Sequence, residues 1–524
     1  MLRSMATGAQ AETEVILGTG GVEPAEVVAV ARAGAPVGLG PDAIEAMERA
    51  AAVVAAIEAS SEPAYGVSTG FGSLATTPIP VAAREQLQLS LLRSHAAGMG
   101  PTVEREVVRA MMLLRARSLA MGYSGTRPVV AEQIVALLNA GITPIVPEHG
   151  SLGASGDLAP LAHSALVLVG EGEAETADGR RLGGAESLAA AGLEPLRLTA
   201  KEGLALINGT DGILGMLVLA CADLAALLRV ADIAAAMSVE ALLGTDRAFA
   251  ADLLALRPQP GQQASGANLR RLLDGSEIVA SHREDDPRVQ DAYSLRCAPQ
   301  VLGAARDALA NAEAAAAAEL GSAIDNPMVL PDTNGGRVES CGNFHGAPVA
   351  IACDLLAIAA AEVGAIAERR TDRLLDASRS YGLPPFLAAD PGVDSGLMIA
   401  QYTQAALVAE NRRLAAPASV DSIPTSAMQE DHVSMGWSAA RKLRTVLANL
   451  TRIVAVELTC AARAIDLRAP LRPAAGTGAA LAALRSAVPG PGGDRWLAPE
   501  LAAAERLTAD GVLTAVEAEI GELE

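Results

Sequence analysis

The chain has 524 residues, a formal net charge of −21 and a hydrophobic fraction of 51%, yet aromatic residues make up only 2% of it. The acidic balance excludes the basic footprint that binding to nucleic acid or to an anionic membrane surface requires. A core so poor in aromatic residues must be packed by alanine, leucine and valine, which favours closely approaching helices over a β-sandwich.

The cysteines and the start of the chain favour a cytoplasmic location. There are five cysteines, widely spaced and without a CxxC pair, which favours reduced thiols in the cytoplasm over a disulfide framework or a zinc site. No histidine pair has the spacing of metal ligands on one helix face, so we expect no bound metal. Residues 1–11 lack the apolar stretch of a signal peptide and are predicted to be a disordered lead-in.

Helical patterns alternate with polar loops in the first part of the chain. An alanine-rich amphipathic pattern predicts a helix over 41–59, which ends at the break Ser60-Ser-Glu-Pro63. The glycine-punctuated loop Tyr65-Gly-Val-Ser-Thr-Gly-Phe-Gly72 follows. Helical periodicity resumes over 84–95 and 103–121.

Part of that loop, Gly66-Val-Ser-Thr-Gly70, fits the GxSxG pattern of a serine hydrolase with Ser68 as the nucleophile. The pattern belongs to a strand–turn–helix unit of an alternating α/β chain. Here a predicted helix and a break precede it, so hydrolysis is a weak alternative.

The stretch Gly150-Ser-Leu-Gly-Ala-Ser-Gly-Asp157 has two interpretations. One is a tight turn and a helix start, with Ser155 or Asp157 as the N-cap. The other is backbone chemistry, because the unshielded Gly156 nitrogen can attack the Ala154 carbonyl carbon if the loop bends tightly. Loss of water and dehydration of Ser155 would then leave an electrophilic ring.

Beyond this loop, residues 170–184 are turn-rich and predict short strands. We place a domain boundary near residue 205, which separates an N-terminal domain (12–205) from a helical bundle (206–524). The apolar run 212–239 contains three charged residues, so it predicts a buried helix pair and not a membrane span.

Apolar stripes at three-and-four spacing predict further long helices over 299–320, 347–375 and 437–466. The expected fold class is all-α, with a long-helix bundle core and a smaller mixed N-terminal domain that carries the Ala154–Gly156 loop. Bundles of this kind commonly associate, so we expect a homo-oligomer.

Three more loops are unusually polar. Gln290, Tyr293 and Arg296 recur at intervals of three, which would put an amide, a phenol and a guanidinium on one face of a helical turn. An arginine so placed is suited to a substrate carboxylate. Phe344 offers an aromatic wall in Gly342-Asn-Phe-His-Gly346, and Gln429-Glu-Asp-His432 combines carboxylates with an imidazole. Taken singly, each loop is also explained by solvated caps and ion pairs.

Seven motifs occur together, in the order YGVSTGFG, RSHAAG, GSLGASGDLAPLAH, ALINGT, VQDAYSLRCAPQ, GNFHG and QEDHVSMG. In this combination the chain, from about residue 12 to its C-terminus, resembles the aromatic amino-acid ammonia-lyase family. The resemblance implies a homotetramer of long helices in which each active site draws residues from three subunits. It also implies a small-molecule amino-acid substrate and no nucleic-acid or membrane partner.

The resemblance assigns the chemistry to six residues: Ala154, Ser155, Gly156, Tyr65, Tyr293 and Glu430. Ala154, Ser155 and Gly156 would cyclise without help into a 4-methylidene-imidazol-5-one, so no diffusible cofactor is expected. Asn208 would lie beside this group. Tyr65 resembles the family's catalytic base, which removes a weakly acidic proton from the substrate β-carbon. Whether Tyr65 or Glu430 takes the proton here is left open by the motifs.

Other matched positions would bind the substrate. Arg296 would hold the substrate carboxylate, Gln290 and Tyr293 would complete that wall, and Phe344 would line the pocket.

His95 and Glu430 match positions that face the substrate side chain. Relatives that act on tyrosine or phenylalanine carry an amide-rich segment where this chain has Met428-Gln-Glu-Asp-His432. Glu430 can accept a hydrogen bond from an imidazole N–H or pair with imidazolium more strongly than a neutral amide can. Met428 departs from the asparagine of many bacterial relatives, with no catalytic consequence that we can name.

The expected reaction is therefore non-oxidative elimination of ammonia from L-histidine to give trans-urocanate, the first step of histidine degradation. Tyrosine ammonia-lyase or tyrosine aminomutase activity is the alternative within the family. Outside it, the alternatives are the serine hydrolase and a helical assembly protein that keeps the scaffold without the chemistry.

Overall fold

The computed structural model describes residues 14–59, 66, 68–70, 76–284, 286, 288–333 and 335–524. The predicted lead-in and Tyr65 lie outside these residues. The chain folds into two compact units, each assembled from separate stretches of sequence. The first comprises the chain up to Leu219 together with Glu313–Cys353 and Pro417–Arg441, and the second comprises Ala220–Ala312, Asp354–Ala416 and Lys442–Glu524. The single boundary near residue 205 stays a prediction.

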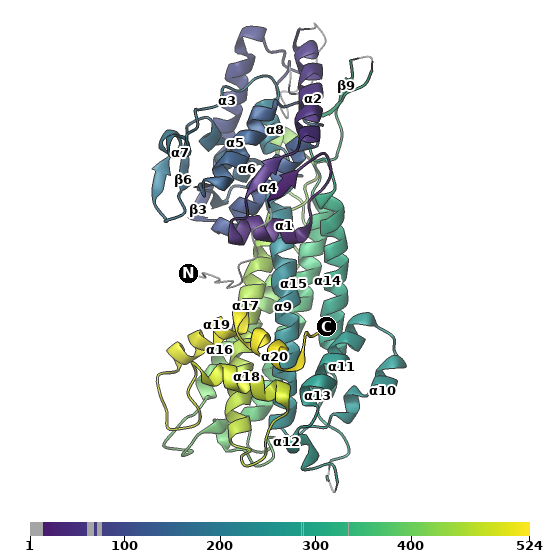
Figure 1. Cartoon of the computed structure of the whole chain (residues 1–524), viewed down its shortest axis with the longest axis vertical. Helices are drawn as coiled ribbons and strands as arrows, with labels where there is room; N and C mark the ends of the chain where they lie inside the picture. Colours follow the sequence, from purple (N-terminus) through teal and green to yellow (C-terminus); the bar gives the residue numbers. More distant parts are fainter. Residues whose placement is uncertain are drawn as a thin grey trace. The chain divides into compact units, whose positions relative to one another are not determined.

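The first unit packs short helices around one buried helix, with small sheets at its periphery (Figure 1). Strand β1 runs parallel to β2, whereas β3–β5, β4–β6–β7 and β8–β9 are antiparallel. Its early helices are α1 (Pro24–Val28), α2 (Pro41–Ala59), α3 (Arg84–His95), α4 (Arg105–Ala120), α5 (Pro128–Asn139), α6 (Leu158–Leu168), α7 (Gly184–Ala190) and α8 (Glu202–Ile207). Its strands are β1 (Val15–Leu17), β2 (Val37–Leu39), β3 (Met99–Thr102), β4 (Thr143–Pro144), β5 (Pro147–His149), β6 (Glu173–Glu175), β7 (Arg181–Gly183), β8 (Met328–Leu330) and β9 (Arg337–Glu339).

Helix α4 is the centre of this unit, since every residue from Val107 to Ala120 is buried. Three of these are arginines, and burying a charge is costly unless hydrogen bonds replace its water. Their guanidinium groups donate to backbone carbonyl oxygens of surrounding segments, Arg109 to Val30 and Leu138, Arg115 to Asn208 and Ile324, and Arg117 to Ser322. The arginines thus tie neighbouring helices and loops of the first unit to α4.

Four long helices have residues in both units, namely α9 (Asp211–Ala241), α14 (Ala298–Leu320), α15 (Ala347–Leu375) and α17 (Gly436–Asp466). The remaining helices are α10 (Ala251–Ala255), α11 (Pro260–Leu273), α12 (Glu277–Ala280), α13 (Tyr293–Arg296), α16 (Met398–Leu414), α18 (Ala475–Arg485), α19 (Leu497–Asp510) and α20 (Val512–Ile520). In the second unit, Ala367 of α15, Val408 of α16 and Ile453 of α17 form one buried apolar cluster.

Helix α9 corrects one prediction, because the apolar run forms a single 31-residue helix and not a helix pair. The charged residues that suggested an interruption are anchored to other elements of the second unit. Asp232 accepts from Ser265, Asn268 and Arg306, while Arg229 pairs with Glu517. A charged side chain with a partner does not break backbone hydrogen bonding, whereas glycine or proline weakens it.

By length and composition alone, three helical stretches could cross a membrane: Glu202–Ala241, Ala347–Leu375 and Gly436–Asp466. In this fold, 72%, 61% and 78% of their most apolar windows are buried inside the protein, respectively. Their hydrophobicity is largely explained by the core that they form.

Most other elements agree with the sequence patterns. Helices α2 and α3 have the predicted bounds, α14, α15 and α17 lie within one residue of theirs, and the turn-rich stretch forms β6 and β7. The expected all-α class with long helices and a mixed region that carries the Ala154–Gly156 loop is confirmed.

Candidate active site

The loop between β5 and α6 holds the Ala154-Ser155-Gly156 triplet in a buried bend. Ser155 and Gly156 are buried, and Gly156 has a φ of +97°, a conformation that residues with a side chain rarely adopt. The Ser151 hydroxyl donates to the Gly156 carbonyl oxygen and closes the bend. The glycine at this position is therefore required by the backbone.

Asp157 fixes the loop against α9. It stands at the N-cap position of α6, but its side chain makes no capping hydrogen bond to that helix. Instead its Oδ2 accepts from the backbone N–H of Gly212, at 2.5 Å, and of Ile213, at 3.4 Å, in the first turn of α9. Complete burial and the nearby Asp211 raise the pKa of Asp157, and the two α9 amides oppose that rise. The prediction that Asp157 stands at the N-cap of a helix is therefore correct, but its side chain binds the start of α9 and not its own helix.

The loop Gly342–Gly346 lies directly against the triplet. The Gly346 amide donates to the Ala154 carbonyl oxygen at 2.8 Å. A Cβ on Gly346 would stand 2.9 Å from the Ser155 carbonyl oxygen, so only glycine permits this approach. Phe344 is partly buried in the same loop.

A third loop, from Ser422 to Trp437, is tied to the same region. Ser434 donates to the Gly153 carbonyl oxygen at 3.4 Å, and the Trp437 indole donates to the Glu148 carbonyl oxygen at 2.8 Å. The His432 ring stacks on that of His345, with centroids 5.7 Å apart and planes inclined by 10°. Loops distant in the sequence therefore converge around Ala154–Gly156.

His95 and Glu430 come close enough to interact electrostatically. His95 is the last residue of α3, and its Nδ1 lies 3.0 Å from the Leu91 carbonyl oxygen. Burial lowers the pKa of His95, while the Leu91 carbonyl and the negative charge of Glu430 oppose that shift. Burial thus favours the neutral imidazole of His95, whereas Leu91 and Glu430 favour its charged form.

His163, in the motif that contains the triplet, has a structural position. Its Nε2 accepts a hydrogen bond from the Gly98 amide at 2.9 Å, which joins α6 to the segment that follows His95. Burial lowers the pKa of His163 and favours the neutral ring that can accept this bond.

Asn208 ends α8, three residues before α9 begins. Its carbonyl oxygen accepts from Arg115 Nη1 at 2.8 Å, and its Nδ2 donates to the Asn326 carbonyl oxygen at 3.0 Å. Motif reasoning missed Arg115 as the support of Asn208. The available signal was a charged residue inside the apolar helix Arg105–Ala120, which must have buried partners.

Gln290, Tyr293 and Arg296 belong to the second unit. Helix α13 begins only at Tyr293, so the prediction that all three share a helical turn was wrong for Gln290, which precedes the helix. The Arg296 guanidinium lies 4.7 Å from the centroid of the Tyr293 ring, and Arg296 Nε is buried without a hydrogen-bond partner in the described part of the chain. The proposed contacts of these residues with substrate stay predictions.

The loop that contains Ser68 sits between two helical elements. The described element before it is α2, and the next is a 3₁₀ turn over Val81–Ala83 that leads into α3. Ser68 is buried, and its neighbour Thr69 pairs with Pro78 in an isolated bridge. Tyr65, the predicted base, lies outside the described residues.

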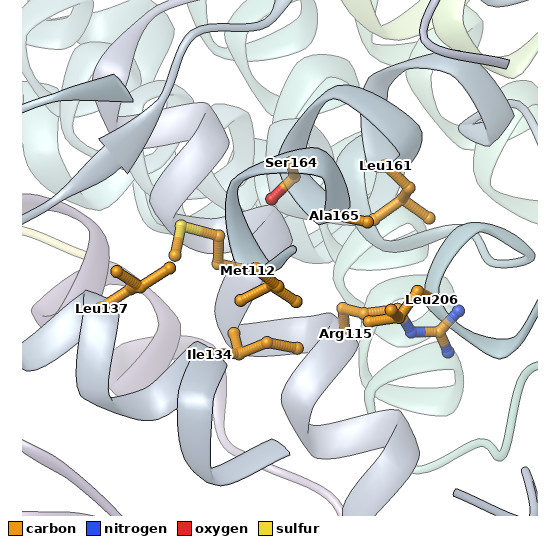
Figure 2. Close-up of a pocket in the computed structure, with 9 residues that line it drawn as sticks. Met112, Arg115, Ile134, Leu137, Leu161, Ser164, Ala165 and Leu206 are labelled. Carbon is orange, nitrogen blue, oxygen red and sulfur yellow. The ribbon is translucent and has the colours of Figure 1, made fainter. Parts of the chain in front are cut away.

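A small pocket within the first unit lies elsewhere, among α4, α5, α6 and α8 (Figure 2). Its walls are apolar except for Arg115 and Ser164, and none of the predicted site residues lines it. We interpret it as a packing gap of the helical core.

The triplet fits the prosthetic group that the motifs imply. Cyclisation requires a bend at Gly156, a Gly156 nitrogen without steric shielding and a fixed Ala154 carbonyl. The positive φ of Gly156 and the 2.8 Å hydrogen bond from Gly346 to the Ala154 oxygen satisfy the first and last of these.

Comparisons with known proteins agree with this arrangement. The family model described as "Aromatic amino acid lyase" matches residues 22–486. A histidine ammonia-lyase of Streptomyces avermitilis is 62% identical over 97% of this chain and 99% of its own length, and one of Gloeobacter violaceus is 54% identical over 95% and 96%.

Solved structures match over the same extent. Histidine ammonia-lyase from Trypanosoma cruzi superposes with a TM-score of 0.88 at 39% identity, covering 97% of this chain and 96% of that one. Tyrosine aminomutase from Streptomyces globisporus gives 0.91 at 37% identity, covering 98% and 100%. Because the family model and these relatives span nearly the whole chain, the protein belongs to the aromatic amino acid lyase family.

Proposed function

We propose that this protein eliminates ammonia from L-histidine and releases trans-urocanate. The observation that carries the proposal is the buried Ala154–Gly156 bend, which lies in the same unit as His95 and Glu430. A carboxylate is the group that recognises an imidazole N–H or imidazolium. The names of relatives with up to 62% identity support the same substrate.

The reaction needs two kinds of help, because ammonia is a poor leaving group and the β-proton a weak acid. A 4-methylidene-imidazol-5-one formed from Ala154, Ser155 and Gly156 would supply an electrophile toward the substrate amine. Asp157 and Gly346 hold the loop that carries it through the contacts with α9 and with the Ala154 carbonyl.

The remaining roles follow the family motifs. Tyr65 would take the β-proton, and Arg296 would bind the substrate carboxylate with a guanidinium suited to two parallel hydrogen bonds. Gln290, Tyr293, Phe344 and Asn208 would complete the pocket. Glu430 would bind the side chain, with proton removal by Glu430 the competing assignment.

We further propose a cytoplasmic homotetramer whose active sites are shared between subunits. Exposed apolar side chains on α15 and α16 of the second unit, Leu355, Ile358, Ile399 and Tyr402, support self-association. The cysteines are widely spaced and form no CxxC motif, which supports a reducing compartment. The strongly acidic charge argues against nucleic-acid or anionic membrane partners.

The test combines mass with turnover. The intact folded protein is expected to be lighter than its sequence by two water molecules, and L-histidine is expected to give urocanate absorbance and ammonia. Ser155→Ala should retain the full sequence mass, remain a folded oligomer and lose turnover. An unmodified wild-type mass would refute the prosthetic group, and an unsaturated product from L-tyrosine in place of L-histidine would refute the substrate.

A further inference from the structure

Glu430 is held at the end of a short hairpin whose other end is Thr425. The two residues form an isolated antiparallel bridge. The Thr425 N–H donates to the Glu430 backbone carbonyl oxygen at 2.9 Å, and the Glu430 N–H donates to the Thr425 backbone carbonyl oxygen at 3.3 Å. Residues directly opposite in such a pair project their side chains on the same face. Thr425 is thereby placed beside the Glu430 carboxylate.

The connecting turn is conformationally demanding. Ser426, Ala427 and Met428 all have positive φ, at 50°, 51° and 69°, although none is glycine. L-residues avoid this region, so consecutive examples persist only where surrounding contacts fix them. Such clusters are typical of functional sites. The turn therefore reverses the chain sharply enough to bring residue 430 back to residue 425.

The hydroxyl of Thr425 is committed to Glu430 and not to the backbone. Thr425 occupies the N-cap position of the 3₁₀ turn Ser426–Met428, where a threonine usually caps an amide, but its side chain makes no capping bond. Instead Oγ1 donates to Glu430 Oε2 at 2.8 Å. A carboxylate has two acceptor oxygens, so fixing one of them orients the other.

We infer that Thr425 is a positioning residue for substrate recognition, which holds one oxygen of Glu430 so that the other is presented to the imidazole of the substrate. The inference rests on the proposed function, in which Glu430 binds the substrate side chain.

The test compares three single variants. Thr425→Val keeps the shape and removes the hydroxyl, so kcat/KM for L-histidine should fall about tenfold, the effect of losing one hydrogen bond to a charged group. Thr425→Ser keeps the donor and should retain most of the activity. Ser422→Ala is the matched control, since it removes the hydrogen bond from Val433 N–H to Ser422 Oγ in the same loop without touching Glu430.

A double-mutant cycle separates positioning from loss of stability. In a Glu430→Ala background, Thr425→Val should have little further effect on kcat/KM, because the group that accepts the Thr425 hydroxyl is gone. An intact mass lighter by two waters in each variant would show that the triplet still matures. Wild-type kcat/KM in Thr425→Val, an equal fall in Ser422→Ala, or an undiminished fall in the Glu430→Ala background would each overturn the inference. Failure of the wild-type protein to act on L-histidine would instead refute the proposed function.

Discussion

At the scale of single residues, the conformation of the Ala154–Gly156 loop depends on two glycines that lack a Cβ and on the buried side chain of Asp157. Gly156 supplies a positive φ, and Gly346 leaves room for a backbone contact. The Asp157 side chain accepts hydrogen bonds from the first turn of α9, whose amides oppose the rise in pKa that burial causes. The chemistry proposed for the loop depends on this geometry, because bond formation within the backbone tolerates little displacement.

Replacement of Gly346 by alanine tests the close approach to Ser155. Its Cβ would stand 2.9 Å from the Ser155 carbonyl oxygen and 2.6 Å from Ile213 Cδ1, so one of the loops must shift. A displacement of about 1 Å can cost on the order of a hundredfold in rate, so we expect kcat to fall by about that factor. Intact mass should also show incomplete loss of water.

Gly342→Ala is the control in the same loop, since its Cβ would meet nothing within 4 Å. It should mature and turn over like the wild type. Normal activity and mass in Gly346→Ala would contradict the packing argument.

At the scale of secondary-structure elements, a buried ion pair joins two long helices of the second unit. Arg370 of α15 and Glu457 of α17 are both fully buried, with Nε to Oε1 at 2.5 Å and Nη2 to Oε2 at 2.9 Å. Ser238 of α9 also donates to Glu457, and Arg370 donates to the Ser294 carbonyl oxygen in α13. The pair thus connects the bundle to the turn that carries Tyr293 and Arg296.

Glu457→Ala should be strongly destabilising because it leaves the Arg370 charge buried without a partner. We expect a loss of about 3–5 kcal/mol in the free energy of unfolding, measured by urea denaturation at fixed protein concentration. The double variant Arg370→Met with Glu457→Leu removes both charges and should recover most of that loss. Equal destabilisation by the single and double variants would show that packing volume, and not the unpaired charge, determines the effect.

At the scale of the whole molecule, the exposed apolar side chains of α15 and α16 predict self-association. Leu355 and Ile358 are 40% and 46% exposed, and a charge placed there would have to be desolvated in an interface. Leu355→Lys with Ile358→Glu should therefore shift light-scattering mass from tetramer toward smaller species and lower activity, since the proposed sites are shared. Leu256→Glu, at a leucine 83% exposed beyond α10, is the control and should keep the wild-type mass. A tetramer in both variants would locate the interface elsewhere.

The sequence by itself determined where the helices lie and which residues could carry the chemistry, because both follow from local patterns of residues. Periodicity gave the bounds of α2 and α3, and the Ala-Ser-Gly triplet with its companion motifs identified the family. Tertiary structure alone decided which loops meet, since those contacts join residues far apart in the chain. The Asp157 side chain reaches Gly212 across 55 positions, and Ser434 reaches Gly153 across 281.

Two predictions, on the apolar run 212–239 and on Gln290, were wrong because local patterns do not show contacts or helix ends that packing determines. The charges in α9 suggested an interruption because their partners, such as Ser265 and Arg306 for Asp232, lie on other helices. Gln290 was assigned to a helical face because spacing alone does not reveal where a four-residue helix starts. A side chain's local spacing limits the faces it can occupy, but its partners, and so the role of a buried charge, are set by packing between distant segments.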